Sequence, residues 1–138
     1  MILKVRLDEG ALLPVRAHDT DAGADILTPS GFKLYPNHGM TIRTGVHVEL
    51  PKGTVGMLKS KSGLNIFHDI IGEGVIDEGY TGEVVVKLYN LGNEPYIFHR
   101  GDKIIQLVVM RVEYPTIQQV DEIAGGERGD AGHGSTGR

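Results

Sequence analysis

The amino-acid sequence predicts an all-β domain built from short antiparallel strands. In several segments apolar residues recur at every second position, which is typical of strands that bury one face. Twenty glycines and six prolines interrupt the 138 residues at short intervals, as in a barrel or sandwich of short strands. No segment of helical length keeps an apolar stripe, so at most one short helix is expected.

The clearest strands lie in the middle and last third of the chain. Residues 45–50 and 83–89 show the alternation of period two and are expected to be half-buried antiparallel strands. Residues 64–69 are expected to form one short turn of helix. Residues 103–112 form a nearly continuous apolar run, which predicts a more buried strand.

The end of the chain differs in composition from the rest. Residues 124–138 contain six glycines and almost nothing that packs in a core, so we expect a domain over residues 1–123 followed by a flexible arm. Glycine-rich tails are mostly disordered. Arg128, Ser135 and Thr136 among many backbone N–H donors are also the groups that an arm closing over phosphates requires. Composition alone leaves both roles open.

Charge and composition disfavour several classes of protein. The formal net charge is −4, whereas direct binding to nucleic acid or to a membrane surface favours a basic face. The chain has no cysteine, which excludes disulfides and thiolate metal sites. Its longest apolar stretch, residues 104–110, is far shorter than the roughly 20 residues that span a bilayer. We therefore expect a soluble, cytoplasmic protein.

Three segments carry polar groups that suit a phosphate site, although each has a simpler explanation. In residues 22–26 (AGADI), Asp25 directly precedes an expected strand and could bind Mg²⁺ through water or bond its own backbone in a turn. Residues 59–64 (KSKSGL) suit a triphosphate or a solvated loop. In residues 100–107 (RGDKIIQL), Gln106 needs a ligand or a backbone partner, because an unpaired buried amide costs about 1–3 kcal/mol.

A fourth segment, residues 74–83 (GVIDEGYTGE), is the most informative. Apolar residues lead into a turn framed by glycines, which predicts a β-hairpin. Asp77 follows two apolar residues, so partial burial is expected to raise its basicity enough to take a proton from water. Tyr80 could cover one face of a small ring. In an ordinary hairpin, Asp77 would be a turn residue and Tyr80 a surface aromatic.

In this order and spacing, the segments resemble the five motifs of the trimeric dUTPase family, and the match runs from residue 22 to residue 137. AGADI resembles the first motif, KSGL at 61–64 the second and GVIDEGYTGE the third. RGDKIIQL resembles the fourth motif and RGDAGHGSTG at 128–137 the fifth. One match could arise by chance, whereas five in the correct order could hardly do so.

The resemblance implies a compact fold of the dUTPase type, a β-clip or distorted barrel, in a homotrimer with active sites at subunit boundaries. It implies Mg²⁺-assisted hydrolysis of dUTP to dUMP and pyrophosphate, by attack of an activated water on the α-phosphate. Such a reaction keeps uracil out of DNA and supplies dUMP for dTMP synthesis.

The resemblance also implies a role for each matching residue. Asp77 would orient or deprotonate the attacking water, and Asp25 would hold the metal through water. Tyr80 would pack on the deoxyribose and leave no room for a 2′-hydroxyl. The other residues expected at the substrate are Lys61, Ser62, Gly63 and Gln106 for the phosphates, Gly74, Val75 and Ile76 for uracil, and Arg128, His133, Gly134, Ser135 and Thr136 in the closing arm.

Two positions depart from the motifs of the family. Lys61 stands where the second motif usually has arginine, and it keeps the charge but loses the bidentate fork. His133 stands where the fifth motif usually has phenylalanine, so the ring is smaller and can titrate near neutral pH.

Three alternatives remain beside the dUTPase interpretation. A dCTP deaminase has a related fold and would release ammonia from dCTP. A regulatory protein that senses dUTP would bind a protein partner, with catalysis secondary. A purely structural trimer would have no use for Asp77, Tyr80 and the tail together.

Overall fold

A computed structural model describes residues 1–134, 136 and 137. The prediction of an all-β fold with one short helix is confirmed for these residues. The strands are β1 (Lys4–Leu7), β2 (Gly23–Leu27), β3 (Phe32–Leu34), β4 (His38–Glu49), β5 (Thr54–Lys59), β6 (Ile70–Ile76), β7 (Glu83–Asn90), β8 (Tyr96–Phe98) and β9 (Lys103–Arg111), and the helix is α1 (Ser62–His68).

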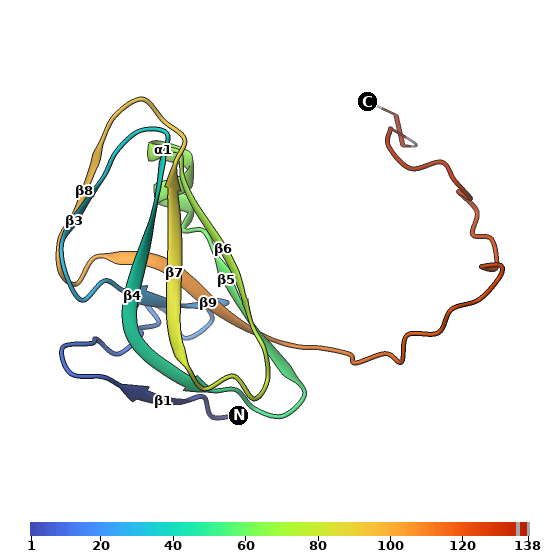
Figure 1. Ribbon diagram of the computed structural model, residues 1–138, viewed down its shortest axis with the longest axis horizontal. Helices are drawn as coiled ribbons and strands as arrows, with labels where there is room; N and C mark the ends of the chain where they lie inside the picture. Colours follow the sequence, from blue (N-terminus) through green and yellow to red (C-terminus); the bar gives the residue numbers. More distant parts are fainter. Residues whose placement is uncertain (135, 138) are drawn as a thin grey trace.

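Seven of these strands form one antiparallel sheet in the order β1-β4-β7-β6-β5-β9-β2, and β3 pairs with β8 in a small second sheet. The large sheet curls strongly, so that β9 runs across the direction of β4 and β7 (Figure 1). The curled sheet, closed on one side by the β3–β8 pair, encloses a single hydrophobic core.

The predicted burial patterns are confirmed in the strands. Val84, Val86 and Leu88 of β7 are buried, and the residues between them face outward. Strand β9 lies inside the sheet between β5 and β2, which explains its nearly continuous apolar sequence. The largest fully buried side chains are those of Phe98, Ile26, Leu34, Ile70, Leu88, Ile104, Ile105 and Leu107.

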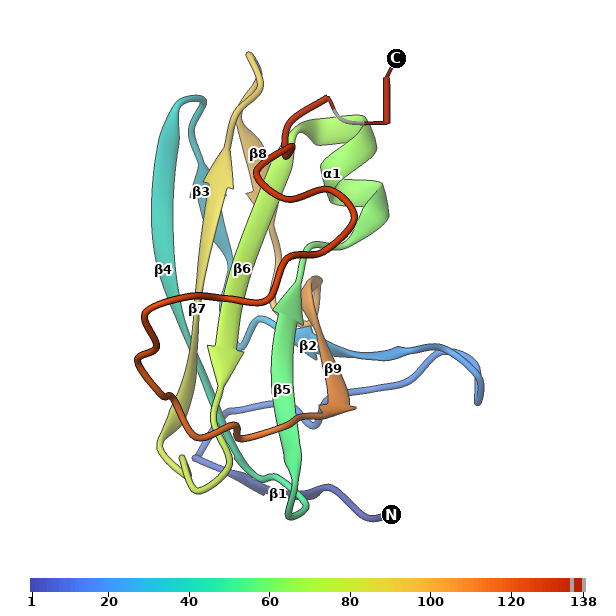
Figure 2. The same ribbon diagram turned by 90° about the vertical axis from the view of Figure 1, so that its right-hand side faces the viewer.

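Helix α1 begins two residues earlier than predicted, immediately after Lys61. It ends at His68, and the next residue, Asp69, caps it: its φ of 54° lies in the left-handed region, and its N–H donates to the carbonyl of Asn65. The helix lies between the end of β5 and the start of β6 (Figure 2). Among the described residues, none of the helical structure is long and apolar enough to cross a bilayer.

After β9 the chain leaves the sheet and runs away from the domain (Figure 1). Every described residue from 113 onward is exposed, so the exposed segment begins before residue 124, where composition placed the boundary. Ile117, Val120 and Ile123 account for this difference, because their apolar character is typical of a domain. In the single chain they are nevertheless 95%, 51% and 88% exposed.

Candidate active site

Asp25, Lys61 and Gln106, which the sequence analysis singled out separately, meet where β2, β9 and the start of α1 come together. Asp25 lies within β2, opposite Gln106 of β9, and the prediction that it precedes a strand is wrong. Its side chain is only 10% exposed, and its Oδ1 lies 2.5 Å from the Nζ of Lys61. Its Oδ2 lies 3.2 Å from the Nζ of Lys103. One carboxylate thus holds two ammonium groups in fixed positions.

Lys103 is a member of this cluster that sequence reasoning missed. Residues three apart on a regular strand face opposite sides, so the alternation gave no reason to place Lys103 with Gln106. The register between β2 and β9 shifts at Ile26 and Leu27, where Ile104 is an additional residue in β9. This β-bulge turns Lys103 to the face of the sheet that carries Asp25.

Gln106 connects β9 to the loop that precedes α1. Its Nε2 donates a hydrogen bond of 3.0 Å to the carbonyl of Ser60, so the alternative of a backbone partner is confirmed. The hydroxyl of Ser60 bonds both the N–H and the carbonyl of Gly72 on β6. The loop leading to Lys61 is thereby fixed from two sides, and Ser62 and Gly63 lie exposed in the first turn of α1.

Strands β6 and β7 form the predicted hairpin, but it is open near its turn. The two strands pair only over Ile70–Gly72 and Leu88–Asn90. Residues 74–76 pair instead with β5 on their other side. Figure 1 shows β6 and β7 close together near α1 and farther apart below. The edges that face each other in the open part therefore keep backbone N–H and C=O groups outside the sheet pairing.

A pocket of about 210 Å³ lies in the open part of the hairpin. The structure brings together four predicted substrate residues around it, because Gly74, Val75, Ile76 and Tyr80 all line this pocket. A flat ring with donors and acceptors on its edge fits such a slot, since backbone groups offer both. The volume is below the roughly 300–1,000 Å³ of typical ligand pockets, so one chain encloses only part of a nucleotide.

The turn between β6 and β7 carries Asp77 and Tyr80. Asp77 is exposed in the single chain, so the predicted partial burial is wrong there: the apolar run ends with β6 at Ile76, and the turn points outward. The hydroxyl of Tyr80 donates to the carbonyl of Glu83 at 2.9 Å, which folds the ring back toward the pocket. The N–H of Tyr80 donates to the carbonyl of Asp77 and closes the turn.

Glu78, the residue after Asp77, anchors the turn on one side, and sequence reasoning missed it. Its Oε1 accepts hydrogen bonds from the N–H of Gly53 at 2.6 Å and from the hydroxyl of Tyr114 at 2.8 Å. The Gly53 bond, and after it the Tyr114 bond, lower the pKa of Glu78. Glu78 therefore stays ionised and binds the turn to the β4–β5 connection. No local sequence pattern predicts contacts between residues so far apart in the sequence.

The lysine cluster and the hairpin turn lie at opposite ends of β5. Ile76 pairs with Gly56, so Asp77 lies beside the start of β5, whereas Lys61 follows its end. At about 3.3 Å per residue, the two are roughly 20 Å apart along the strand direction. This separation is too large for both residues to act on one phosphorus atom within a single chain.

The tail forms a third group, apart from the other two. The guanidinium of Arg128 donates to the carbonyls of Ala131 and Gly132, at 3.1 and 2.8 Å, and so bonds within the tail itself. His133, Gly134 and Thr136 are exposed. Ser135 lies outside the residues that the structure describes.

The donor set suits a metal that brings most of its own ligands. Over residues 1–134, 136 and 137, no three His, Asp or Glu side chains gather into a metal centre. Asp25 offers a single buried carboxylate beside the cluster of lysines. Mg²⁺ fits this arrangement, because it keeps several waters and takes one or two carboxylates together with substrate phosphates.

Comparisons with known proteins agree on one family. The sequence profile described as dUTPase matches residues 9–137. A deoxyuridine 5'-triphosphate nucleotidohydrolase of Mycobacterium leprae is 45% identical over 142 residues, which cover 96% of this chain and 92% of the relative. The protein of the same description from Mycobacterium tuberculosis is 46% identical with the same coverage.

Solved structures show the same fold. A mutant dUTPase of Staphylococcus bacteriophage 80alpha, solved with dUpNHpp, superimposes with a TM-score of 0.92 and 30% identity over 99% of both chains. A mutant dUTPase from phage phi11 of S. aureus, described with a coordinated structural Mg(II) ion, gives a TM-score of 0.81 and 31% identity. That match covers 88% of this chain and 98% of the phage protein.

Proposed function

Because this chain belongs to the dUTPase family and is a dUTP nucleotidohydrolase, we propose that it releases dUMP and pyrophosphate at sites shared between subunits, with Asp77 activating the attacking water. The observation that carries this proposal is the open hairpin. Its open part holds a pocket for a flat ring, lined by Ile76 and Tyr80, and the turn between these two residues carries the exposed Asp77. The reaction would keep uracil out of DNA and supply dUMP for dTMP synthesis.

Asp77 supplies the base of the reaction. The oxygen of a water attacks the α-phosphorus, the bond from this phosphorus to the oxygen that bridges it to the β-phosphate breaks, and pyrophosphate leaves. The proton of the water passes to the carboxylate of Asp77. Asp77 lies in the turn with its carboxylate exposed, so it can orient such a water. Positioning of this kind accounts for much of the rate enhancement in enzymatic phosphate hydrolysis.

The lysine cluster holds the triphosphate. Lys61 and Lys103 neutralise phosphate oxygens, and Gln106 and the N–H groups at the start of α1 fix their orientation. Asp25 keeps the two lysines in place in the free enzyme, and it would hold Mg²⁺ through water in the complex. When bound, Mg²⁺ neutralises charge on the phosphates.

Selectivity for uracil follows from the backbone of the hairpin. The unpaired groups of Gly74–Ile76 bond the donor and acceptor pattern on the edge of uracil. Cytosine reverses part of that pattern and leaves buried groups unpaired, which a polar site rejects strongly. Tyr80 packs on the deoxyribose and leaves no room for a 2′-hydroxyl, so UTP is excluded on steric grounds.

We place each active site between subunits of a homotrimer. The distance of roughly 20 Å between Lys61 and Asp77 along the sheet supports this, because both residues must reach the same triphosphate. The small size of the hairpin pocket also supports sites shared between subunits, and so does the arm, which lies away from the domain in Figure 1. The exposed Ile117, Val120 and Ile123 are apolar surface that a neighbouring subunit would cover.

Two experiments test these proposals. Pyrophosphate release with Mg²⁺ is measured for dUTP, dCTP, dTTP and UTP; release from dUTP alone is expected, and ammonia release from dCTP would favour the deaminase alternative. The second experiment tests whether the site is shared. Inactive Lys61→Ala and Asp77→Ala variants are unfolded together and refolded. Mixed trimers are expected to regain activity if the two residues come from different subunits, and a lack of recovery would contradict the shared site.

Gly23, the glycine of the first motif, packs against Gln106, and its substitution tests whether the position of the Gln106 side chain matters for hydrolysis. A Cβ at this position would lie 2.9 Å from the Cβ of Gln106 and would overlap its amide. We expect Gly23→Ala to displace Gln106 and to lower kcat/KM for dUTP by about tenfold. The double variant with Gln106→Ala should be no worse than Gln106→Ala alone. Additive losses would show that Gly23 acts by another route.

The histidine at position 133 gives a test of the closing arm. We expect His133→Phe to leave the KM for dUTP unchanged or to lower it by up to about tenfold, because a larger ring stacks better on the base. Steady-state kinetics between pH 6 and 8 measure this effect. A large loss of activity would instead assign His133 a separate role.

A further inference from the structure

His47 lies near the end of β4, where β1 and β7 pair with this strand on its two sides. Its partners in register are Arg6 of β1 and Glu83 of β7. A β-bulge between Arg43 and His47, where Gly45 has a φ of 68°, sets this register. The imidazole is only 12% exposed. It is therefore a largely enclosed titratable group next to the hairpin that carries Asp77.

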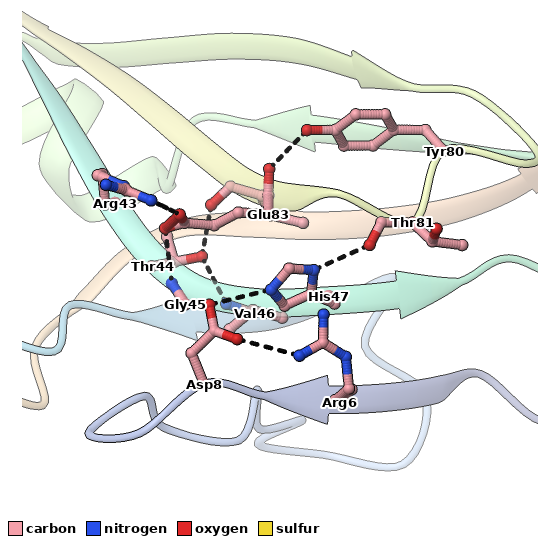
Figure 3. A network of polar contacts seen from close by, with 11 residues as sticks. Arg6, Asp8, Arg43, Thr44, Gly45, Val46, His47, Tyr80, Thr81 and Glu83 are labelled. Atoms are coloured by element: carbon pink, nitrogen blue, oxygen red, sulfur yellow. Dashed lines mark hydrogen bonds and ion pairs between the residues drawn. The ribbon is translucent and has the colours of Figure 1, made fainter.

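Both ring nitrogens of His47 face oxygen atoms that only accept hydrogen bonds. Nδ1 lies 2.8 Å from the carbonyl oxygen of Thr81, and Nε2 lies 3.0 Å from Oδ2 of Asp8 (Figure 3). A neutral imidazole carries one N–H and satisfies only one of these acceptors. The geometry therefore favours the doubly protonated, positively charged ring.

The charges around His47 agree with this protonation state. The hydrogen bond to Asp8, and next the bond to the Thr81 carbonyl, raise the pKa of His47, whereas burial and the charge of Arg6 oppose them. The same contact lowers the pKa of Asp8, so both partners favour the ion pair. The charged groups that face the ring or line the hollow beside it are Arg6, Asp8 and Lys4 at β1, Arg43 and Glu49 on β4, and Glu83 on β7.

Thr81 is the point at which this network reaches the active site. It follows Tyr80 directly and lies in the turn that begins at Asp77. Glu78 anchors the first half of the turn through Gly53. His47 anchors the second half. The turn is thus held at two points, and only the second depends on a proton.

We propose that His47 is a positioning residue of the hydrolysis, whose charged ring clamps the Thr81 carbonyl and so fixes the turn that presents Asp77 and Tyr80. This inference rests on the proposed roles of those two residues. When the ring loses a proton, one nitrogen faces an acceptor with a lone pair, and either the Thr81 or the Asp8 bond is lost. The clamp is therefore complete below the raised pKa of His47 and is lost as the pH rises through it.

The test compares the pH dependence of kcat/KM for dUTP in the wild type and three variants. The wild type is expected to lose activity by about tenfold as His47 deprotonates. His47→Gln, which does not titrate, is expected to have a lower and flat profile over the same range. Asp8→Asn should shift the loss to lower pH. His38→Gln, a change at the exposed start of the same strand, should keep the wild-type profile.

A proton NMR titration of the His47 ring tests the clamp in the wild-type protein and needs no activity assay. The His47 signal, identified by its absence in His47→Gln, should titrate above the ordinary pKa of histidine and return toward it in Asp8→Asn. An ordinary pKa in the wild type would overturn the inference. A wild-type pH profile in His47→Gln would overturn it as well. Failure of the wild type to hydrolyse dUTP would instead overturn the proposed function.

Discussion

Asp77→Asn is expected to lower kcat for dUTP by about 100- to 10,000-fold, the range that a general base contributes. Asparagine has nearly the same shape but does not accept the proton of the attacking water. Because Asp77 is exposed and lies outside the core, the fold and the Tm should not change. Single-turnover kinetics measure the chemical step directly.

Binding separates a chemical role of Asp77 from a structural one. Calorimetry with a non-hydrolysable dUTP analogue should give Asp77→Asn nearly the wild-type affinity. Asp19→Asn, at another exposed aspartate, is the matched control and should keep full activity. If Asp77→Asn retained more than about a tenth of the wild-type kcat, the assignment of the base would be wrong.

Removal of residues 124–138 is expected to lower kcat/KM for dUTP by about 100- to 1,000-fold and to leave the Tm unchanged. In the proposed mechanism the arm closes over the phosphates, so its removal takes away the Arg128 charge and several hydrogen-bond donors, each of which changes the rate by a large factor in a water-excluded site. The unchanged stability follows from the structure, because the hydrogen bonds of Arg128 stay within the tail. Pyrophosphate release and thermal melting check the two parts.

Point substitutions in the full chain assign the effect of the truncation. Arg128→Ala should reproduce a large share of the loss, whereas Glu127→Gln, at the neighbouring position, should not. A truncated chain with wild-type kinetics would show that the arm is a passive terminus, as its composition alone suggested.

The strands and the motifs could be predicted because each depends on neighbours in the sequence. Alternation predicted β7, a nearly continuous apolar run predicted β9, and the glycine-framed turn of the hairpin located Tyr80 at its pocket. The place of Lys103 in the cluster around Asp25 could not be predicted, because it depends on a bulge in the pairing of β2 with β9. The contacts of Glu78 and His47 join residues 25 and 34 positions apart, and no periodicity records them.

The prediction that Asp77 is partly buried was wrong for a related reason. Two apolar neighbours indicate that a strand is buried, but they say nothing about where the strand stops. In this fold β6 ends at Ile76, one residue before the carboxylate. Composition assigned Ile117, Val120 and Ile123 to the domain because they are apolar, and it does not show that they lie outside the core of a single chain.

The open hairpin also determines how readily base preference changes in evolution. In the proposed site the base is recognised by the main chain of this hairpin, and Val75 is 62% exposed. Substitutions at such a position alter the surface and leave the donor and acceptor pattern of the slot intact. In such a site the backbone conformation sets the preference for one pyrimidine. A new specificity would then require an insertion or a changed bend of the backbone, and a new side chain would not be enough.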